Sequence, residues 1–213
     1  MSHALYPVLL DVRRLRILVV GGGPVAARKV ASLVEAGARP EIVSPAVSDE
    51  LRGMVNAHGL SHHPRSYELG DAAGCHLVFA ATDDAAVNAR VVDEARAAGA
   101  LANRADEGGE GDFQVPSSIR QDRVVLAFST GGASPLLARR LRERLEQVAT
   151  PGLGRAARRL REVRGEVQAR WAADEGRRRA FWFELVTPEL LDLAVAGRDE
   201  EVEQAIRRCL SQS

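Results

Sequence analysis

The predicted architecture rests on one stretch of the chain, Ile17-Leu18-Val19-Val20-Gly21-Gly22-Gly23-Pro24-Val25-Ala26. Four apolar residues that favour a β-strand lead into three glycines, and a helical pattern begins at Pro24 and stops at Gly37. Gly21, Gly23 and Ala26 match the spacing GxGxxA, in which the first glycine permits a tight turn and the second removes a Cβ where a pyrophosphate would approach. The stretch therefore predicts a strand, a turn and a helix that bind a dinucleotide, with a purely structural glycine turn as the alternative.

The helix after the glycines would bind the anion through the free N–H groups of its first turn, and its dipole would favour the negative charge. Pro24 suits the first helical position because no hydrogen-bond donor is needed there. The residues predicted to contact the dinucleotide in this turn are Gly21, Gly22, Gly23, Pro24 and Val25.

Strands and helices alternate through the first half of the chain. Beyond residues 17–20, strands are predicted at 41–43, 60–63, 76–81 and 101–103, with helices at 24–36, 48–57 and 85–98, and a further short strand at 6–11. This alternation predicts an α/β fold, a Rossmann-type parallel sheet with helices on both faces. Because ligands of such sheets bind at the carboxyl ends of the strands, the candidate residues should lie there.

Six further cofactor candidates follow the predicted strands, namely Ser44, Pro45, Ala46, Thr82, Asp83 and Asn103. Ser44 stands where many dinucleotide folds place an acidic residue for the ribose 2′-hydroxyl. A serine can hydrogen-bond a ribose but does not repel a 2′-phosphate, so these residues leave NAD and NADP open. Thr82 and Asp83 would face the cofactor, cap the following helix, or do both.

Asp106 is the candidate acid or base. It follows the fifth predicted strand, at the start of a glycine-rich loop beside the expected nicotinamide end of the site, where a general base would have to stand. Aspartate is also common in turns, so a turn former is the alternative.

The pattern changes after Asp106. A strand is predicted at 124–128 and a helix at 136–148, followed by helices at 153–172, 175–185, 188–196 and 200–210. Between the strand and the first of these helices, hydroxyls and glycine N–H groups precede a helix N-terminus, which describes an anion site and a simple capped turn equally well. The candidate substrate-binding residues there are Ser129, Thr130, Gly131 and Gly132. We therefore expect a nucleotide-binding domain at 1–116, a strand–helix connector at 117–150 and a small C-terminal helical domain at 151–213.

The composition excludes several classes of function. The formal net charge is zero, so the molecule offers no overall field to nucleic acid or to a membrane surface. Two distant cysteines and five histidines match no disulfide framework and no metal spacing, and neither a membrane-spanning run nor a signal peptide is present. These features predict a cytoplasmic protein without a fixed metal centre. Arginines crowd between 139 and 179, as solvated helix faces or as a rim that attracts a polyanionic small molecule.

Taken together, these segments resemble the precorrin-2 dehydrogenase / sirohydrochlorin ferrochelatase family, including the amino-terminal module of siroheme synthases. The resemblance covers essentially the whole chain. The matching pieces are residues 6–11, 19–26 with Arg28 and Lys29, 35–38, 80–84 with Val87 and Asn88, Asn103 with Asp106, Phe113 with 116–117, 129–135 with 137–139, and 177–179 with Phe181 and Trp182.

The resemblance implies NAD-dependent oxidation of precorrin-2 to sirohydrochlorin, followed in some members by insertion of Fe2+ as a second substrate. It also implies a homodimer joined through residues 117–150 and a functional role for Asp106. Thr130 stands where the family has a serine, so the resemblance does not carry the role of that serine over to this residue. Two other readings stay open: a regulatory module that binds NAD without catalysis, and another small oxidoreductase on the same fold.

Overall fold

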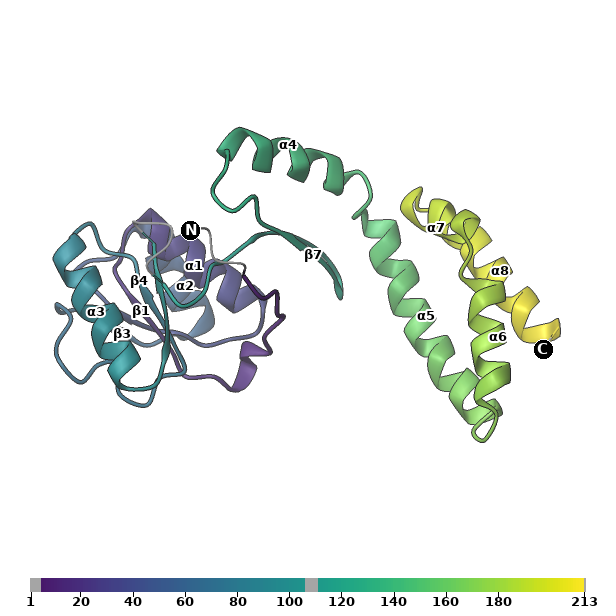
Figure 1. Cartoon of the computed structure of the whole chain (residues 1–213), viewed down its shortest axis with the longest axis horizontal. Coiled ribbons are helices and arrows are strands. Elements are labelled where there is room, and N and C mark those ends of the chain that lie inside the picture. The colour runs from purple at the N-terminus through teal and green to yellow at the C-terminus, as the bar shows by residue number, and fades with distance from the viewer. Residues whose placement is uncertain (1–4, 106–110, 213) are drawn as a thin grey trace. The chain divides into compact units, whose positions relative to one another are not determined.

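The computed structural model describes residues 5–105 and 111–212 and divides the chain into two compact units, Met1–Val115 and Pro116–Ser213 (Figure 1). Each unit is described by itself. The boundaries predicted from the sequence, with a separate connector at 117–150, stay a prediction. Within the described ranges, no helix combines the length and apolar character needed to cross a membrane.

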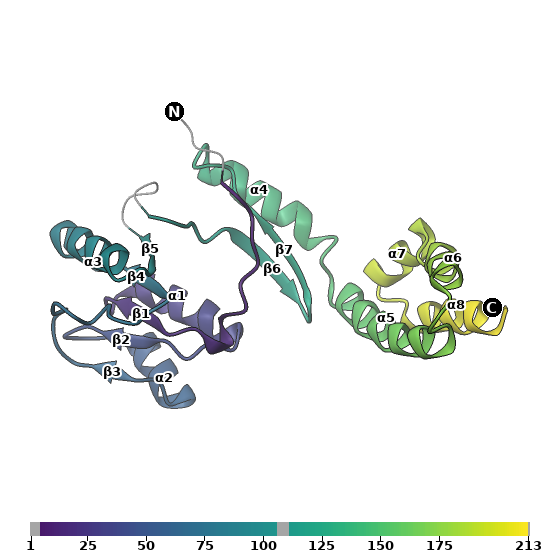
Figure 2. The same ribbon diagram turned by 60° about the horizontal axis from the view of Figure 1, so that its bottom comes forward.

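The first unit is built on a sheet of five parallel strands in the order β3-β2-β1-β4-β5 (Figure 2). The strands are β1 (Ile17–Val20), β2 (Glu41–Val43), β3 (His62–His63), β4 (Leu77–Ala80) and β5 (Leu101–Arg104). Helix α1 (Pro24–Glu35) connects β1 to β2, α2 (Asp49–His58) connects β2 to β3, and α3 (Ala85–Ala97) connects β4 to β5. The predicted parallel α/β sheet is confirmed.

Both faces of this sheet are covered by helices. Ile17 and Val19 pack in one apolar cluster with residues of α1 and α2, whereas Leu18 and Val20 pack in a second cluster with residues of α3. Successive side chains of a strand point to opposite faces, and all four residues of β1 are buried. This double burial explains why the strand reads as a continuous apolar run rather than an alternating one.

The helix ends follow local capping chemistry. The hydroxyl of Ser48 accepts the N–H of Leu51 at the start of α2, and Gly59, in the left-handed conformation with a φ of 60°, follows its last residue. Asp84 accepts the N–H groups of Ala86 and Val87 and so caps α3. These caps fix where the loops at the carboxyl edge of the sheet give way to helices.

The strand predicted at 6–11 is wrong. The described part of this segment is exposed and belongs to no sheet, and the chain then makes a single 3-10 turn at Val12–Arg14. An extended segment needs a neighbouring strand to satisfy its backbone groups, and Pro7 lacks one of the N–H donors that such pairing would use. The apolar composition therefore predicted a strand that has no partner within the described residues.

The second unit begins with a β-hairpin that the sequence predicted only in part. Strand β6 (Ser117–Gln121), which the sequence left within the connector, pairs antiparallel with β7 (Val124–Phe128) across a turn in which Asp122 has a φ of 54°. Helix α4 (Pro135–Glu146) follows, capped by Ser134, and its Arg142 guanidinium donates to the carbonyl oxygen of Ser118.

Four helices complete the second unit. They are α5 (Pro151–Arg170), α6 (Glu175–Leu185), α7 (Pro188–Val195) and α8 (Asp199–Gln212). Their apolar faces meet in one cluster around Val163, Phe181 and Ile206, each at most 1% exposed. The Trp171 and Trp182 rings lie 5.8 and 5.3 Å from the Phe181 ring centroid, so the aromatic residues of 177–183 partly serve this core.

Candidate functional site

The glycine turn joins β1 to α1 at the carboxyl edge of the sheet. A Cβ on Gly21, whose φ is 121°, would lie 2.3 Å from the carbonyl oxygen of Ala81, and a Cβ on Gly22 would lie 1.9 Å from that of Ala46. A Cβ on Gly23 would meet no atom within 4 Å. Gly21 and Gly22 therefore lack a Cβ because backbone atoms of the protein occupy that space, whereas the space beside Gly23 is open. Gly22, which the GxGxxA pattern leaves unassigned, is the most tightly packed of the three.

The N-terminus of α1 has the properties of an anion site. Gly23 occupies the N-cap position and has no side chain that could bind the first-turn N–H groups, and Pro24 takes the position where a donor is unnecessary. The Ala27 N–H donates to the Gly23 carbonyl in the first turn of the helix. This bond leaves the N–H groups of Val25 and Ala26, which precede Ala27 in the chain, to an outside acceptor. An anion beside Gly23 would receive these donors together with the positive end of the helix dipole.

The loop after β2 is joined to this turn by the Ser48 N–H, which donates to the Gly22 carbonyl at 2.8 Å. The hydroxyl of Ser44 lies 2.7 Å from the carbonyl oxygen of Ala46, and because a carbonyl only accepts, the hydroxyl must donate to it. Ser44 is buried, and its own carbonyl accepts a hydrogen bond from His62 Nε2 at 2.9 Å. The proton with which Ser44 was expected to bind a ribose is thus engaged inside the loop, whereas Pro45 and Ala46 are exposed.

The turn after β4 is held by a buried amide. Asn88, which is fully buried, accepts both the N–H and the hydroxyl of Thr82 and donates to the Thr82 carbonyl, at 3.1, 2.7 and 2.9 Å. Asp84, not Asp83, caps α3. Thr82 is therefore a structural element of the turn, and Asp83 is exposed beside it.

Asn103 contributes the one buried polar side-chain atom that lacks a partner among the described residues. Its side chain is on β5 and is 6% exposed; Nδ2 donates to the carbonyl oxygen of Phe113, and Oδ1 has no hydrogen bond. Leaving such a carbonyl group unsatisfied costs about 1 to 3 kcal/mol. Oδ1 is therefore an acceptor suited to a donor N–H that the described residues do not supply.

Two cations of the first unit had no predicted role. Arg104 Nη2 donates to the carbonyl oxygen of Ala85 at 3.3 Å, which brings a positive charge to the place where β5 ends and α3 begins. Lys29 lies half-buried on α1, and this burial, with repulsion from Arg28, lowers the pKa of its ammonium group. Within residues 5–105 and 111–212, no three histidine, cysteine or acidic side chains are grouped to hold a metal ion.

The remaining predicted residues fall elsewhere. Asp106 lies outside the described residues. Ser129, Thr130, Gly131 and Gly132 belong to the second unit, where the Ser129 hydroxyl accepts the N–H of Gly131 and the Thr130 carbonyl accepts that of Ala133. Both glycines are left-handed, and a Cβ on either would meet nothing within 4 Å. This segment is a tight, open turn.

His62 and Asn88 were absent from the predicted site, although they fix the two loops that flank the glycine turn. Asn88 belongs to the segment that resembles the known family, and this was its only sequence signal. His62 contacts Ser44 across 18 residues of chain, and no local pattern predicts that contact.

Two family models match the chain. Residues 8–117 match the model described as "Putative NAD(P)-binding", and residues 126–147 match the model described as the central part of sirohaem biosynthesis proteins. A siroheme synthase of Nitrosococcus oceani is 36% identical over 204 residues, and one of Sodalis glossinidius is 40% identical over 205 residues. Each alignment covers 96% of this chain and 43% of the relative, so the chain spans less than half the length of these curated relatives.

A solved structure gives a match of similar size. The protein named SirC, precorrin-2 dehydrogenase, is 28% identical, superimposes with a TM-score of 0.76, and is covered completely by the alignment, which takes in 95% of this chain. The predicted fold class, a Rossmann-type sheet followed by a strand–helix region and a helical domain, is that of this neighbour.

Proposed function

Because this chain belongs to the NAD(P)-binding family whose model spans residues 8–117, we propose that it catalyses the NAD-dependent oxidation of precorrin-2 to sirohydrochlorin. The family resemblance and the nicotinamide dinucleotide cofactor predicted from the sequence are confirmed by the matches. The reaction itself is proposed from the names of a neighbour and of relatives that act in siroheme synthesis. The alignment of SirC with this chain over nearly the whole length of both supports the proposed reaction.

The observation that carries the proposal is the open face of Gly23 in front of the uncapped N-terminus of α1. The residues present fit a dinucleotide: backbone N–H groups for the pyrophosphate, the exposed Pro45 and Ala46 for the adenosine ribose, and the unpaired Asn103 Oδ1 for a carboxamide N–H. NAD, when bound, accepts the hydride that the substrate loses. The chain's own task is to bind and orient both molecules and to accept the proton.

We assign the proton to Asp106. The oxidation removes a hydride and a proton, and Asp106 follows the carboxyl end of β5 two residues after Arg104. A carboxylate near its usual pKa of about 3.9 is a weak base, so its position should contribute more than its basicity.

The test is Asp106→Asn in the intact protein, assayed with NAD and enzymatically prepared precorrin-2. We expect kcat to fall by about 10² to 10⁴, the usual contribution of a placed acid or base, with NAD affinity unchanged in calorimetry. Near-normal oxidation by the variant would remove Asp106 from this step. An inactive wild-type protein that still binds NAD would instead favour the regulatory module, and oxidation of a different substrate would favour another small oxidoreductase.

Insertion of Fe2+ stays a prediction of the family resemblance, with Fe2+ as a substrate. Incubation of the protein with sirohydrochlorin and Co2+ or Fe2+, without NAD, measures it directly. A rate above the uncatalysed one would establish chelation, and an equal rate would confine the protein to the oxidation.

We also propose a homodimer formed through residues 117–150. The support is the apolar surface of α4, on which Leu136, Leu137 and Leu141 are 63%, 48% and 39% exposed. Amphipathic helices normally bury such a stripe, and a second copy of the same surface is the simplest symmetric cover. The location that we propose for the protein is the cytoplasm, because the free thiol of Cys75 suits a reducing environment.

A further inference from the structure

The hydrogen bonding of the sheet is extended at the end of β4 by a side chain of α3. The ladder between β4 and β1 continues to Ala81, whose N–H donates to the Val20 carbonyl at 2.8 Å. The next N–H along the chain, that of Thr82, donates to Asn88 Oδ1 at 3.1 Å. A residue of the following helix therefore fixes the backbone of the turn at the carboxyl edge, where the cofactor site lies.

The chemistry of Thr82 determines how the Asn88 amide is oriented. A backbone N–H only donates and a carbonyl only accepts, so Oδ1 must face the N–H of Thr82 and Nδ2 must face its carbonyl, at 2.9 Å. The Thr82 hydroxyl donates to the same Oδ1 at 2.7 Å. Because Asn88 is 0% exposed, loss of these bonds would leave polar groups of the turn without a partner beside a buried cavity.

The glycine turn lies directly against the group that Asn88 binds. A Cβ on Gly21 would lie 2.3 Å from the carbonyl oxygen of Ala81 and 3.1 Å from the backbone nitrogen of Thr82. The φ of Gly21 is 121°, a value that residues with a side chain rarely adopt. The backbone of Ala81 and Thr82 therefore forms one side of the space in which the glycine turn takes its conformation.

We propose that Asn88 is a positioning residue for the dinucleotide. By holding Thr82 against Gly21, it keeps the glycine turn in the conformation that directs the N-terminus of α1 toward the pyrophosphate. The inference rests on the NAD site of the proposed function, but not on the oxidation of precorrin-2. A turn that is ordered before the ligand arrives does not have to be ordered by the ligand, so the affinity for NAD is higher.

A purely structural role of Asn88 gives a different expectation. Hydrogen bonds to a buried amide stabilise a fold whether or not it binds a ligand. In that case the loss of Asn88 would lower the free energy of unfolding, and the molecules that remain folded would bind NAD as before. Measurement of both quantities on the same variants distinguishes the two roles.

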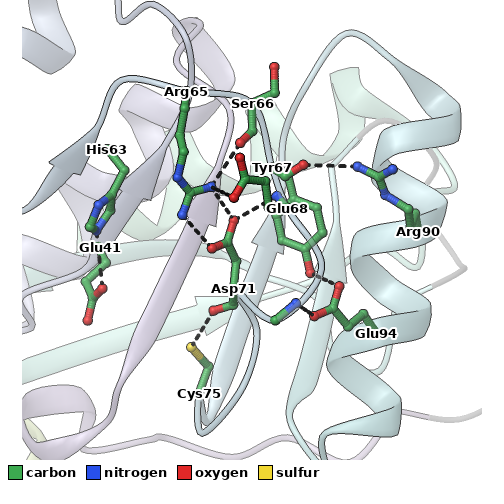
Figure 3. A network of polar contacts seen from close by, with 11 residues as sticks. Glu41, His63, Arg65, Ser66, Tyr67, Glu68, Asp71, Cys75, Arg90 and Glu94 are labelled. Carbon is green, nitrogen blue, oxygen red and sulfur yellow. Dashed lines mark hydrogen bonds and ion pairs between the residues drawn. The ribbon is translucent and has the colours of Figure 1, made fainter.

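Glu94 provides the matched control on the same helix. Its Oε2 accepts the hydroxyl of Tyr67 at 2.6 Å, and its Oε1 accepts the N–H of Gly70 (Figure 3). Tyr67 is 5% exposed, so the loss of Glu94 also leaves a shielded polar group without its partner. These bonds join α3 to the connection between β3 and β4, away from the turn that holds Thr82. Glu94→Ala should therefore reduce stability without loosening the glycine turn.

The experiment measures NAD affinity by calorimetry and stability by urea denaturation in the full chain. We expect Asn88→Ala to raise the Kd for NAD about 10-fold, and Glu94→Ala to leave it within about twofold of the wild-type value. Thr82→Val removes only the hydroxyl that donates to Asn88 and should raise the Kd about threefold. Since that hydroxyl acts through Asn88, Thr82→Val should have almost no further effect in the Asn88→Ala background.

Two results would overturn the inference: a wild-type Kd in Asn88→Ala, or additive effects of Asn88→Ala and Thr82→Val on the Kd. Should Asn88→Ala fail to fold, the comparison of Thr82→Val with Glu94→Ala decides, and equal Kd values in these two variants reject the positioning role. Failure of the proposed function looks different. A wild-type protein that binds NAD without oxidising precorrin-2 leaves the Kd comparison intact, whereas one that does not bind NAD rejects the cofactor site and this inference together.

Discussion

The sheet of the first unit and the hairpin–helix region of the second, residues 117–146, contrast in how they bury their apolar residues. Val19 and Val78 in the sheet are fully buried, and every residue of β1 and β4 is buried. Of the residues described in β6, β7 and α4, Ile119 alone is buried. Strand β7 and helix α4 have clear secondary-structure signals in sequence, as the sheet does, yet only the sheet buries its apolar residues within its own unit.

This difference bears on what each region needs in order to be stable. Burying a large aliphatic side chain contributes about 1.5 to 3 kcal/mol relative to leaving it exposed, and the sheet gains this on both faces. A twelve-residue helix is marginal in water without tertiary packing, and α4 has no buried residue. The comparison teaches that the sheet buries its apolar residues within its own unit, while α4 leaves its apolar face exposed, which is the surface that the proposed homodimer would use.

The same substitution should destabilise the two regions to different extents. Gly22→Ala forces a Cβ to within 1.9 Å of the Ala46 carbonyl, a backbone atom that cannot move cheaply, so we expect a loss of more than about 3 kcal/mol in the free energy of unfolding. Gly132→Ala meets no atom within 4 Å and should cost only the strain of its left-handed φ of 78°, about 1 to 2 kcal/mol. Urea denaturation followed by circular dichroism measures both, and equal losses would contradict the contrast in packing.

Gly23→Asp separates binding from folding within the sheet region. The open space at Gly23 should admit the side chain, so the free energy of unfolding should change by less than about 1 kcal/mol. The new carboxylate would meet the pyrophosphate, and NAD affinity should fall by more than about 100-fold, or about 2.7 kcal/mol. Calorimetry checks this, with Gly23→Ala as the uncharged control, and an unchanged affinity in Gly23→Asp would remove the glycine turn from the cofactor site.

Leu137→Asp tests whether a second copy covers α4. A carboxylate within an apolar interface should raise the dimer dissociation constant by at least about 30-fold, or about 2 kcal/mol. Leu69→Asp is the control, because Leu69 is also an exposed leucine, at 84%, but belongs to the sheet region. Sedimentation velocity distinguishes the cases. A monomeric wild-type protein, or a dimer that tolerates Leu137→Asp, would reject this interface.

Much of the sheet region was predictable because its signals are local. Residues 17–26 carry the apolar run, the turn glycines and the helix start in sequence order, and α1 begins at Pro24 as predicted. Strand β6 was missed because Ser117-Ser118-Ile119-Arg120-Gln121 contains one apolar residue, and only its pairing with β7 makes it a strand. The prediction of a strand at 6–11 failed for the converse reason. The composition of this segment is typical of a strand, but the segment pairs with no other strand among the described residues.

In the candidate site, too, only the features with a local sequence signal were predictable. The spacing of glycines placed the turn at the carboxyl edge, but it did not reveal that Gly22 is packed against Ala46 or that the Ser44 proton is already used. Asn88 and His62 act through partners that the fold brings to them. Whether a given polar residue binds a ligand or a neighbouring loop therefore depends on tertiary contacts, which sequence pattern does not contain.

The smallest expected effect concerns charge pairs in the two regions. The Arg65 guanidinium beside Asp71 lowers the pKa of that carboxyl below its usual value, and the Asp71 side chain is only 13% exposed. On the hairpin–helix side, Arg140 and Glu143 form a pair of similar length, 2.8 Å, but are 71% and 41% exposed. Exposed pairs contribute at most about 1 kcal/mol, while hydrogen bonds to a charged and shielded group contribute about 1.5 to 3 kcal/mol.

The sign of the pH dependence follows from the lowered pKa of Asp71. Because the folded protein binds this proton less readily than the unfolded chain, the pair stabilises the fold above the unfolded pKa of about 3.9, and this contribution is lost as the pH falls through the lower folded value. The unfolding free energies of wild type and Asp71→Asn should therefore differ by about 1 to 2 kcal/mol at pH 7 and converge below about pH 4. Glu143→Gln should differ from wild type by less than about 0.5 kcal/mol at pH 7. Urea titrations between pH 3 and pH 7 measure this, and a pH-independent difference for Asp71→Asn would show that Asp71 acts through packing rather than through its charge.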